Sequence, residues 1–150
     1  MRMKAILFCA CLLLGTTVSY SQQSATAKSS MTIDATDEDA SSETEGNMQT
    51  INQLVKAGDS TAKPRMVQHA IYFKTTKDRS EYIKFAVKNG FKVNGMETSE
   101  DKAEAYPYSL RISNVSDVRV ETMNRITYML RTEAASHNGD YDGWGAPVTK

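Results

Sequence analysis

The clearest periodicity in the chain is the alternation of apolar and polar residues from Tyr106 to Asn114. One face of a strand here would carry Tyr106, Tyr108, Leu110 and Ile112, and the other face Ser109, Arg111 and Ser113. A strand with one buried and one solvent-exposed face is typical of an antiparallel sheet that is covered on a single side. A second strand is predicted from Arg65 to Lys74, because β-branched and aromatic residues are dense there.

Two segments carry apolar residues at the spacing of an amphipathic helix. The first is 77–88, which Thr75 and Thr76 can cap at its start and the pair Asn89-Gly90 ends. Its apolar stripe consists of Tyr82, Ile83, Ala86 and Val87. The second is 120–137, which the pair Asn138-Gly139 stops. Its stripe consists of Val120, Met123, Ile126, Leu130 and Ala134.

The other elements have weaker patterns. A short helix is predicted to begin near residue 48 and to end at Gly58, with a stripe of Met48, Ile51, Leu54 and Val55. Residues 91–93 open a strand, and the polar segment 94–105 is either a long connection or an extension of the hairpin. Residues 140–148 form the last strand, in which Pro147 is tolerable near an edge or end.

The predicted element order is a helix followed by β-α-β-β-α-β. This order indicates an α+β fold, a ferredoxin-like split β-α-β sandwich with an extra N-terminal helix. Right-handed crossovers place the first and third strands in the middle of the sheet and the last strand beside the first. Residues 47–150 are enough for one modest domain.

The first 21 residues are predicted to be a signal peptide. Basic residues at Arg2 and Lys4 precede a short apolar run, and small residues favour cleavage between Ser21 and Gln22. A membrane anchor and a lipoprotein modified at Cys11 are the alternatives, but the run is shorter than the roughly 20 residues of a membrane span. We therefore expect an exported protein, periplasmic or extracellular, that does not contact the membrane after cleavage.

Two further expectations follow from this organisation. Both cysteines, Cys9 and Cys11, lie in the signal segment, so the mature protein would have no disulfide, thiolate nucleophile or cysteine metal site. Residues 22–46 are polar and acidic with almost no large apolar side chain, which predicts a disordered tether.

The segment Asp140-Tyr-Asp-Gly-Trp-Gly145 contains the only Trp of the chain, and His69-Ala-Ile-Tyr-Phe73 lies in the predicted first strand. Together they resemble the regulator of ribonuclease activity B family, the ribonuclease E inhibitors. That family also carries Tyr-Asp-Gly-Trp-Gly in its last strand and a His followed by aromatics in its first. The resemblance implies an α+β sandwich that is not an enzyme and that acts by docking on ribonuclease E.

The predicted topology lets the first and last strands meet, so their distinctive residues form a candidate binding site. Its members are His69, Tyr72, Asp140, Tyr141, Asp142, Gly143, Trp144 and Gly145. The competing interpretation is a structural corner, with Trp144 as an anchor, the glycines permitting a bulge, and a buried, hydrogen-bonded His69.

Other chemistries are weakly signalled. Asp140–Gly143 resembles the start of a calcium loop but lacks its bidentate Glu, and His69 and His137 are too few for a typical zinc site. Tyr72 and Arg111 alone do not make the aromatic platform of an RNA-binding sheet. We therefore expect no metal, no cofactor and no direct contact with nucleic acid.

Two hypotheses for function remain at this point. The first is a non-enzymatic regulatory or protein-binding domain, used outside the cytoplasm because of the export signal. The second is a small hydrolase or metal-dependent enzyme that uses His69 with Asp140 or Asp142.

Overall fold

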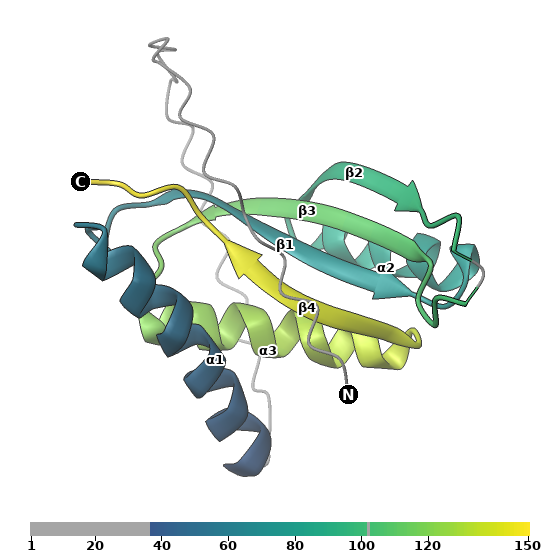
Figure 1. Cartoon of the computed structure of the whole chain (residues 1–150), viewed down its shortest axis with the longest axis horizontal. Helices are drawn as coiled ribbons and strands as arrows, with labels where there is room; N and C mark the ends of the chain where they lie inside the picture. The colour runs from purple at the N-terminus through teal and green to yellow at the C-terminus, as the bar shows by residue number, and fades with distance from the viewer. Residues whose placement is uncertain (1–36, 102) are drawn as a thin grey trace, which may run out of the picture. The chain divides into compact units, whose positions relative to one another are not determined.

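The computed structural model describes residues 37–150 with the exception of residue 102, and in this range it is an α+β fold with four strands and three helices (Figure 1). The strands are β1 (Arg65–Phe73), β2 (Lys92–Thr98), β3 (Tyr108–Ser116) and β4 (Gly139–Gly145). The helices are α1 (Asp37–Lys56), α2 (Thr76–Lys88) and α3 (Val120–Ser136). The predicted signal peptide, residues 1–21, lies outside the described residues.

The four strands form one antiparallel sheet in the order β2-β3-β1-β4. The predicted order is therefore confirmed, with β1 and β3 in the middle and β4 beside β1. Helices α2 and α3 lie on one side of this sheet, and α1 packs against α3 (Figure 1). We call the two sides of the sheet the covered face and the open face.

Residues of β1 alternate between the two faces. Val67, Ile71 and Phe73 are fully buried on the covered face, whereas Met66 is half exposed on the open face. The main core joins these strand residues to the buried stripes of α2 and α3: Ile71, Phe73, Tyr82, Ala86, Phe91, Leu110, Ile112, Ile126, Leu130, Ala134 and Tyr141. A second cluster lies under α1 and contains Ile51, Leu54, Val67, Val118 and Met123.

Helix boundaries follow the predicted caps closely. The Thr75 side chain accepts a hydrogen bond from the Asp78 amide at the start of α2, and Gly90 ends it with a φ of 84°. At the end of α3 the left-handed position is taken by Asn138, with a φ of 51°. Gly139 is instead needed for close approach, because a Cβ there would lie 2.7 Å from the Phe73 ring.

Helix α1 differs most from the prediction. It begins at Asp37, so the expected tether of 22–46 is wrong for residues 37–46, and residues 22–36 lie outside the described range. Ile51 and Leu54 are buried as expected, but Met48 and Val55 are exposed. The rest of the buried stripe is polar: Glu43 and Asn47. A search for apolar periodicity cannot find a helix that packs through hydrogen bonds and an ion pair.

The strands also differ from the predicted bounds: β1 ends one residue earlier, at Phe73, and β3 spans Tyr108–Ser116 instead of 106–114. The other two strands differ as follows. β2 continues to Thr98, so the polar segment after residue 93 extends the hairpin. β4 ends at Gly145, three residues before the predicted end, because the chain beyond it bonds to the α1–β1 connection. The Thr149 carbonyl accepts from the Ser60 amide, and the Pro147 carbonyl accepts from the Arg65 guanidinium. Among the described residues, no helix combines the length and apolar character needed to cross a membrane.

Candidate functional site

A β-bulge in β4 determines where the residues of the 140–145 motif point. The β1–β4 pairing matches Ile71 with Tyr141 and Ala70 with Gly143, which leaves Asp142 as the extra residue. Gly143 has a φ of 137°, a conformation that residues with a Cβ rarely adopt. The sequence therefore permits the bulge through its glycine, as the structural-corner interpretation expected.

The bulge brings two aromatic residues onto the same face. In a regular strand, Tyr141 and Trp144 are three residues apart and would point to opposite faces. With one extra residue between them, Tyr141 pairs with Ile71 and Trp144 pairs with His69, and both β1 partners point to the covered face. Both aromatic side chains therefore reach the interior.

His69 is a buried, fully hydrogen-bonded residue of this interior. Its side chain is 1% exposed, and the Phe91 ring stacks edge-on with a centroid distance of 5.7 Å. Nε2 lies 3.1 Å from Asn114 Oδ1, and Nδ1 lies 2.9 Å from the Tyr141 hydroxyl. Because an amide oxygen only accepts, Nε2 carries the proton and Nδ1 accepts from Tyr141. The neutral ring satisfies both contacts.

The electrostatics of this cluster favour uncharged side chains. Burial lowers the pKa of His69 from 6.5 to about 4, and the hydrogen bond with Asn114 acts in the opposite direction. Burial also raises the pKa of the Tyr141 hydroxyl well above its usual value. A neutral imidazole with both nitrogens occupied is a structural group, since neither nitrogen is directed toward solvent or a substrate.

Trp144 joins β4 to α1 and α3 through a polar chain. Its Nε1 donates to Asn47 Oδ1 at 2.7 Å, and the Asn47 amide donates to Asn124 Oδ1 at 2.8 Å and to Thr127 Oγ1 at 2.9 Å. Asn124 in turn donates to Thr44 Oγ1 at 2.8 Å. The side chain of Trp144 is partly buried against the second core cluster. One asparagine therefore holds three elements together.

A second connection runs from α1 to the histidine. Glu43 forms an ion pair with Arg131 of α3, and the Arg131 guanidinium lies over the Tyr141 ring, 5.4 Å from its centroid. Tyr141 is the hydrogen-bond partner of His69. Tyr141 and Trp144, together with His69, form the part of the site on the covered face, which we call the covered half. Their contacts fix α1 to the sheet.

The remaining residues of the motif belong to the open face or to the edge of β4. Asp140 is exposed and pairs with Tyr72, whose neighbours Ile71 and Phe73 point into the core. Asp142, the bulge residue, is also exposed. Gly143 and Gly145 pair with Ala70 and Gln68, so β4 itself contributes no side chain to the open face at these two positions. The structure therefore divides the predicted site between two faces of the sheet.

The strand registers define rows of residues across the open face. One row across the four strands consists of Gly143, Ala70, Arg111 and Gly95. The next row places Asp140 and Tyr72 on one side and Glu97 on the other, with Ser109 between them. Asp140 and Tyr72 therefore lie near the β4 edge of the open face, one row away from Arg111.

Comparison with known proteins identifies the family. Residues 44–146 match the family Regulator of ribonuclease activity B. The chain belongs to this family. The matched segment starts within α1 and includes the whole sheet, so the resemblance predicted from the two motifs is confirmed. A search of curated proteins found no match.

Membership bears directly on the two hypotheses for function. The family is one of regulators, not enzymes, which supports the protein-binding hypothesis. The enzyme hypothesis required His69 to act with Asp140 or Asp142, but His69 faces the helices and Asp140 faces the opposite side. Within the described part of the chain, no group of three or more His, Cys, Asp or Glu residues could hold a metal ion.

Sequence reasoning missed the partners that hold the covered half. These are Glu43, Asn47, Asn114, Asn124, Thr127 and Arg131. One signal was present, because Glu43, Asn47, Ile51 and Leu54 recur at helical spacing. A polar residue on such a stripe indicates a buried hydrogen-bonded contact.

Proposed function

We propose that this protein is a non-enzymatic regulator that binds a protein partner through the open-face side of β1 and β4. The contacting residues are Tyr72, Asp140 and Asp142, which we call the acidic margin. The family partner, a ribonuclease E, serves as the test partner, because the docking surface would be the same whether the chain meets this nuclease or, once exported, another basic protein. The observation that carries the proposal is the bulge in β4, which separates exposed acids from buried anchors within six consecutive residues.

The covered half supports this role by positioning the margin. His69, Tyr141 and Trp144 each have a hydrogen-bond partner inside the domain. These contacts fix β4 against β1, α1 and α3, so the backbone at Asp140 and Asp142 is held in one conformation. A rigid element presents a binding surface at a lower cost in conformational entropy than a mobile loop does.

The chemistry of the margin selects the kind of partner. Asp140 and Asp142 are exposed carboxylates, and the basic residue Arg111 lies one row away on β3. Such a surface attracts a basic segment and speeds its association in a salt-dependent way. Tyr72 is half-buried and pairs with Asp140, so its aromatic ring can provide contact area.

We also propose that the fold is the ferredoxin-like split β-α-β sandwich.

A separate proposal is that the protein acts outside the cytoplasm. The support for export is the sequence of residues 1–21 alone. Mass spectrometry of the protein purified from its native host should find Gln22 as the first residue. An intact N-terminus would contradict export through a cleaved signal, and lipid on Cys11 would contradict cleavage between Ser21 and Gln22. In an exported protein the partner would be a different basic protein docked on the same margin.

The binding role can be tested with the full chain and purified ribonuclease E. Binding should be saturable, and the rate of RNA cleavage should change in proportion to occupancy. The matched control is a charge-preserving variant at the margin, Asp140→Glu with Asp142→Glu, which should still bind. Cleavage of RNA by this protein alone, or an unchanged nuclease in the presence of saturating protein, would contradict the proposal.

A further inference from the structure

β2 is an edge strand whose outer side has no neighbouring strand in the described sheet. Six of its seven residues are exposed, and Gly95 is intermediate. Apolar side chains are part of this exposure, with Val93 at 36% and Met96 at 55%. An exposed edge with apolar side chains is a template for pairing with another strand.

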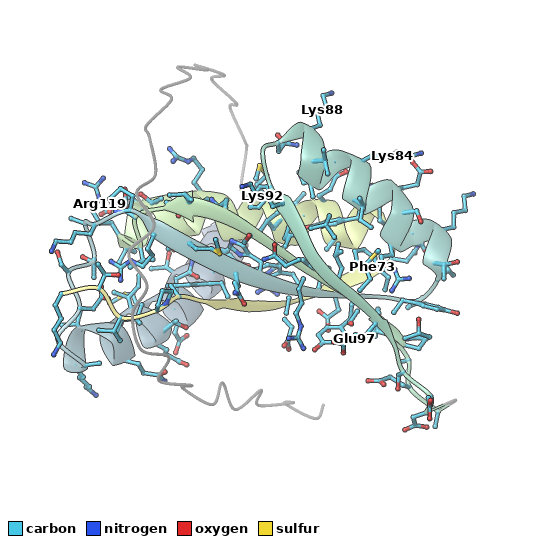
Figure 2. All side chains as sticks on the ribbon, turned by 90° about the horizontal axis from the view of Figure 1, so that it is seen from above. Phe73, Lys84, Lys88, Lys92, Glu97 and Arg119 are labelled. Carbon is cyan, nitrogen blue, oxygen red and sulfur yellow. The ribbon has the colours of Figure 1, made fainter. Side chains whose placement is uncertain are left out.

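A β-bulge sets the faces of the β2 side chains. The β2–β3 register pairs Val93 with Ile112 and Gly95 with Arg111, so Asn94 is the extra residue. As a result Lys92 and Glu97 both point to the open face, opposite Ser113 and Ser109 respectively. Val93 and Met96 both point to the covered face, opposite Ile112 and Leu110. Figure 2 shows Lys92 and Glu97 at opposite ends of β2.

This arrangement makes the strand complementary to itself. In an antiparallel pair of two copies about a two-fold axis between residues 94 and 95, Lys92 lies opposite Glu97 of the other copy. Val93 lies opposite Met96, and each pair occurs twice because of the symmetry. Residues that lie opposite each other must share a face. Without the bulge, Lys92 and Glu97 would point to opposite faces and this register would fail.

The other edge of the sheet has no such property. β4 exposes Asp140 and Asp142, and the strand contains no basic residue. Antiparallel pairing of two β4 strands would bring carboxylates together, which is destabilising. Its bulge also turns Trp144 inward to α1. The two edges therefore differ in charge pattern, and only β2 offers opposite charges at matched positions.

We propose that β2 pairs with β2 of a second copy of this chain, so that the two four-stranded sheets become one continuous sheet. Backbone hydrogen bonds along the edge provide the attraction, and the Lys92–Glu97 pairs on the open face fix the register. The Val93–Met96 pairs cover each other on the helix side. The proposal does not depend on the proposed function, because the acidic margin lies at the opposite edge of the sheet.

Charge exchange tests this register directly. Sedimentation equilibrium of the full chain over a range of concentrations should show a monomer–dimer equilibrium. Lys92→Glu places like charges opposite each other twice, and it should weaken dimerisation on the order of tenfold or more. Glu97→Lys should weaken it similarly. The double variant K92E/E97K restores opposite charges in the two-fold register, and its dissociation constant should return close to that of the wild type.

Both residues are exposed, so the circular dichroism and the melting temperature of the monomer should be unchanged in all three variants. Amide hydrogen exchange gives a second readout, since the amides on the outer edge of β2 should become protected as concentration rises. A protein that stays monomeric at every concentration overturns the proposal. So does a dimer that Lys92→Glu leaves intact, or a double variant no better than the single ones.

Discussion

The two faces of the β1–β4 pair give neighbouring residues opposite roles. Tyr141 and Trp144 point to the covered face, where hydrogen bonds connect them to His69 and Asn47. Asp140 and Asp142 of the same strand are exposed to solvent. In this family member, one short motif therefore places hydrogen-bonded aromatic side chains on one side of the sheet and leaves two carboxylates exposed.

The difference has a physical origin in the single extra residue of the bulge. Alternation alone would place residues 140, 142 and 144 on one face, and Trp144 would then lie beside the acids. The bulge moves Trp144 to the interior and leaves the acids outside. Substitutions on the covered face should therefore change stability, whereas substitutions on the open face should change binding.

The largest expected difference is between two residues of β1. Ile71 is fully buried on the covered face, whereas Met66 is 50% exposed on the open face. Ile71→Ala should reduce the free energy of unfolding by about 2–5 kcal/mol through lost burial and the cavity left behind. Met66→Ala should change it by less than about 0.5 kcal/mol. Urea denaturation measures both, and equal losses would contradict the assignment of faces.

His69 should make the protein sensitive to mild acid. Its pKa is about 4 in the folded state and 6.5 as an unperturbed group, so the unfolded chain binds the proton first. Stability is complete above pH 6.5 and falls as the pH decreases from 6.5 to about 4, by about 3 kcal/mol in total.

Denaturation curves at a series of pH values test this dependence. His69→Gln removes the titrating ring, so this part of the pH dependence should disappear in the variant even if its stability is lower at neutral pH. A wild-type protein with the same pH profile as His69→Gln would show that the ring is not buried in its neutral form.

The bulge itself can be tested at Gly143. Its φ of 137° is strained for alanine, although a Cβ at this position would meet no atom within 4 Å, so the cost is conformational. Gly143→Ala should destabilise the domain by about 1–3 kcal/mol. Gly95→Ala is the matched control, because Gly95 has equal space and no positive φ. A harmless Gly143→Ala would mean that the motif does not require the bulge.

The smallest stability effect concerns the link to α1. Trp144→Phe keeps an aromatic ring and removes the Nε1 donor to Asn47. The loss should be about 1 kcal/mol, because the Asn47 amide keeps its contacts with Asn124 and Thr127. A double-mutant cycle with Asn47→Ala measures the coupling. Strict additivity would show that the Trp144–Asn47 contact does not stabilise the fold.

Much of the frame could be predicted from the sequence, because it depends on strong periodicity and on capping residues. The position of β3 could be predicted from its alternation, and the ends of α2 from the Thr75 cap and the Gly90 stop. The rule of right-handed crossovers predicted that β1 and β3 lie in the middle of the sheet. The start of α1 was missed because Glu43 and Asn47 bury polar groups, which apolar periodicity does not detect.

The division of the candidate site could not be predicted from residue spacing. A glycine in a strand indicates that a bulge is possible, but it does not say which neighbouring residue is the extra one. That choice depends on the contacts of Tyr141 with His69 and of Trp144 with Asn47, which join segments far apart in the chain. The candidate residues could therefore be named from sequence as a hypothesis, whereas the faces on which they lie could not.

The most direct test of the account is the affinity of the double variant Asp140→Asn with Asp142→Asn for ribonuclease E, measured at two salt concentrations beside its melting temperature. The account predicts an affinity loss on the order of tenfold, a weaker salt dependence and an unchanged melting temperature. The control is Glu45→Gln with Glu121→Gln, which removes two exposed acids from α1 and α3. Unchanged affinity in the aspartate variant, or an equal loss in the control, would contradict the account.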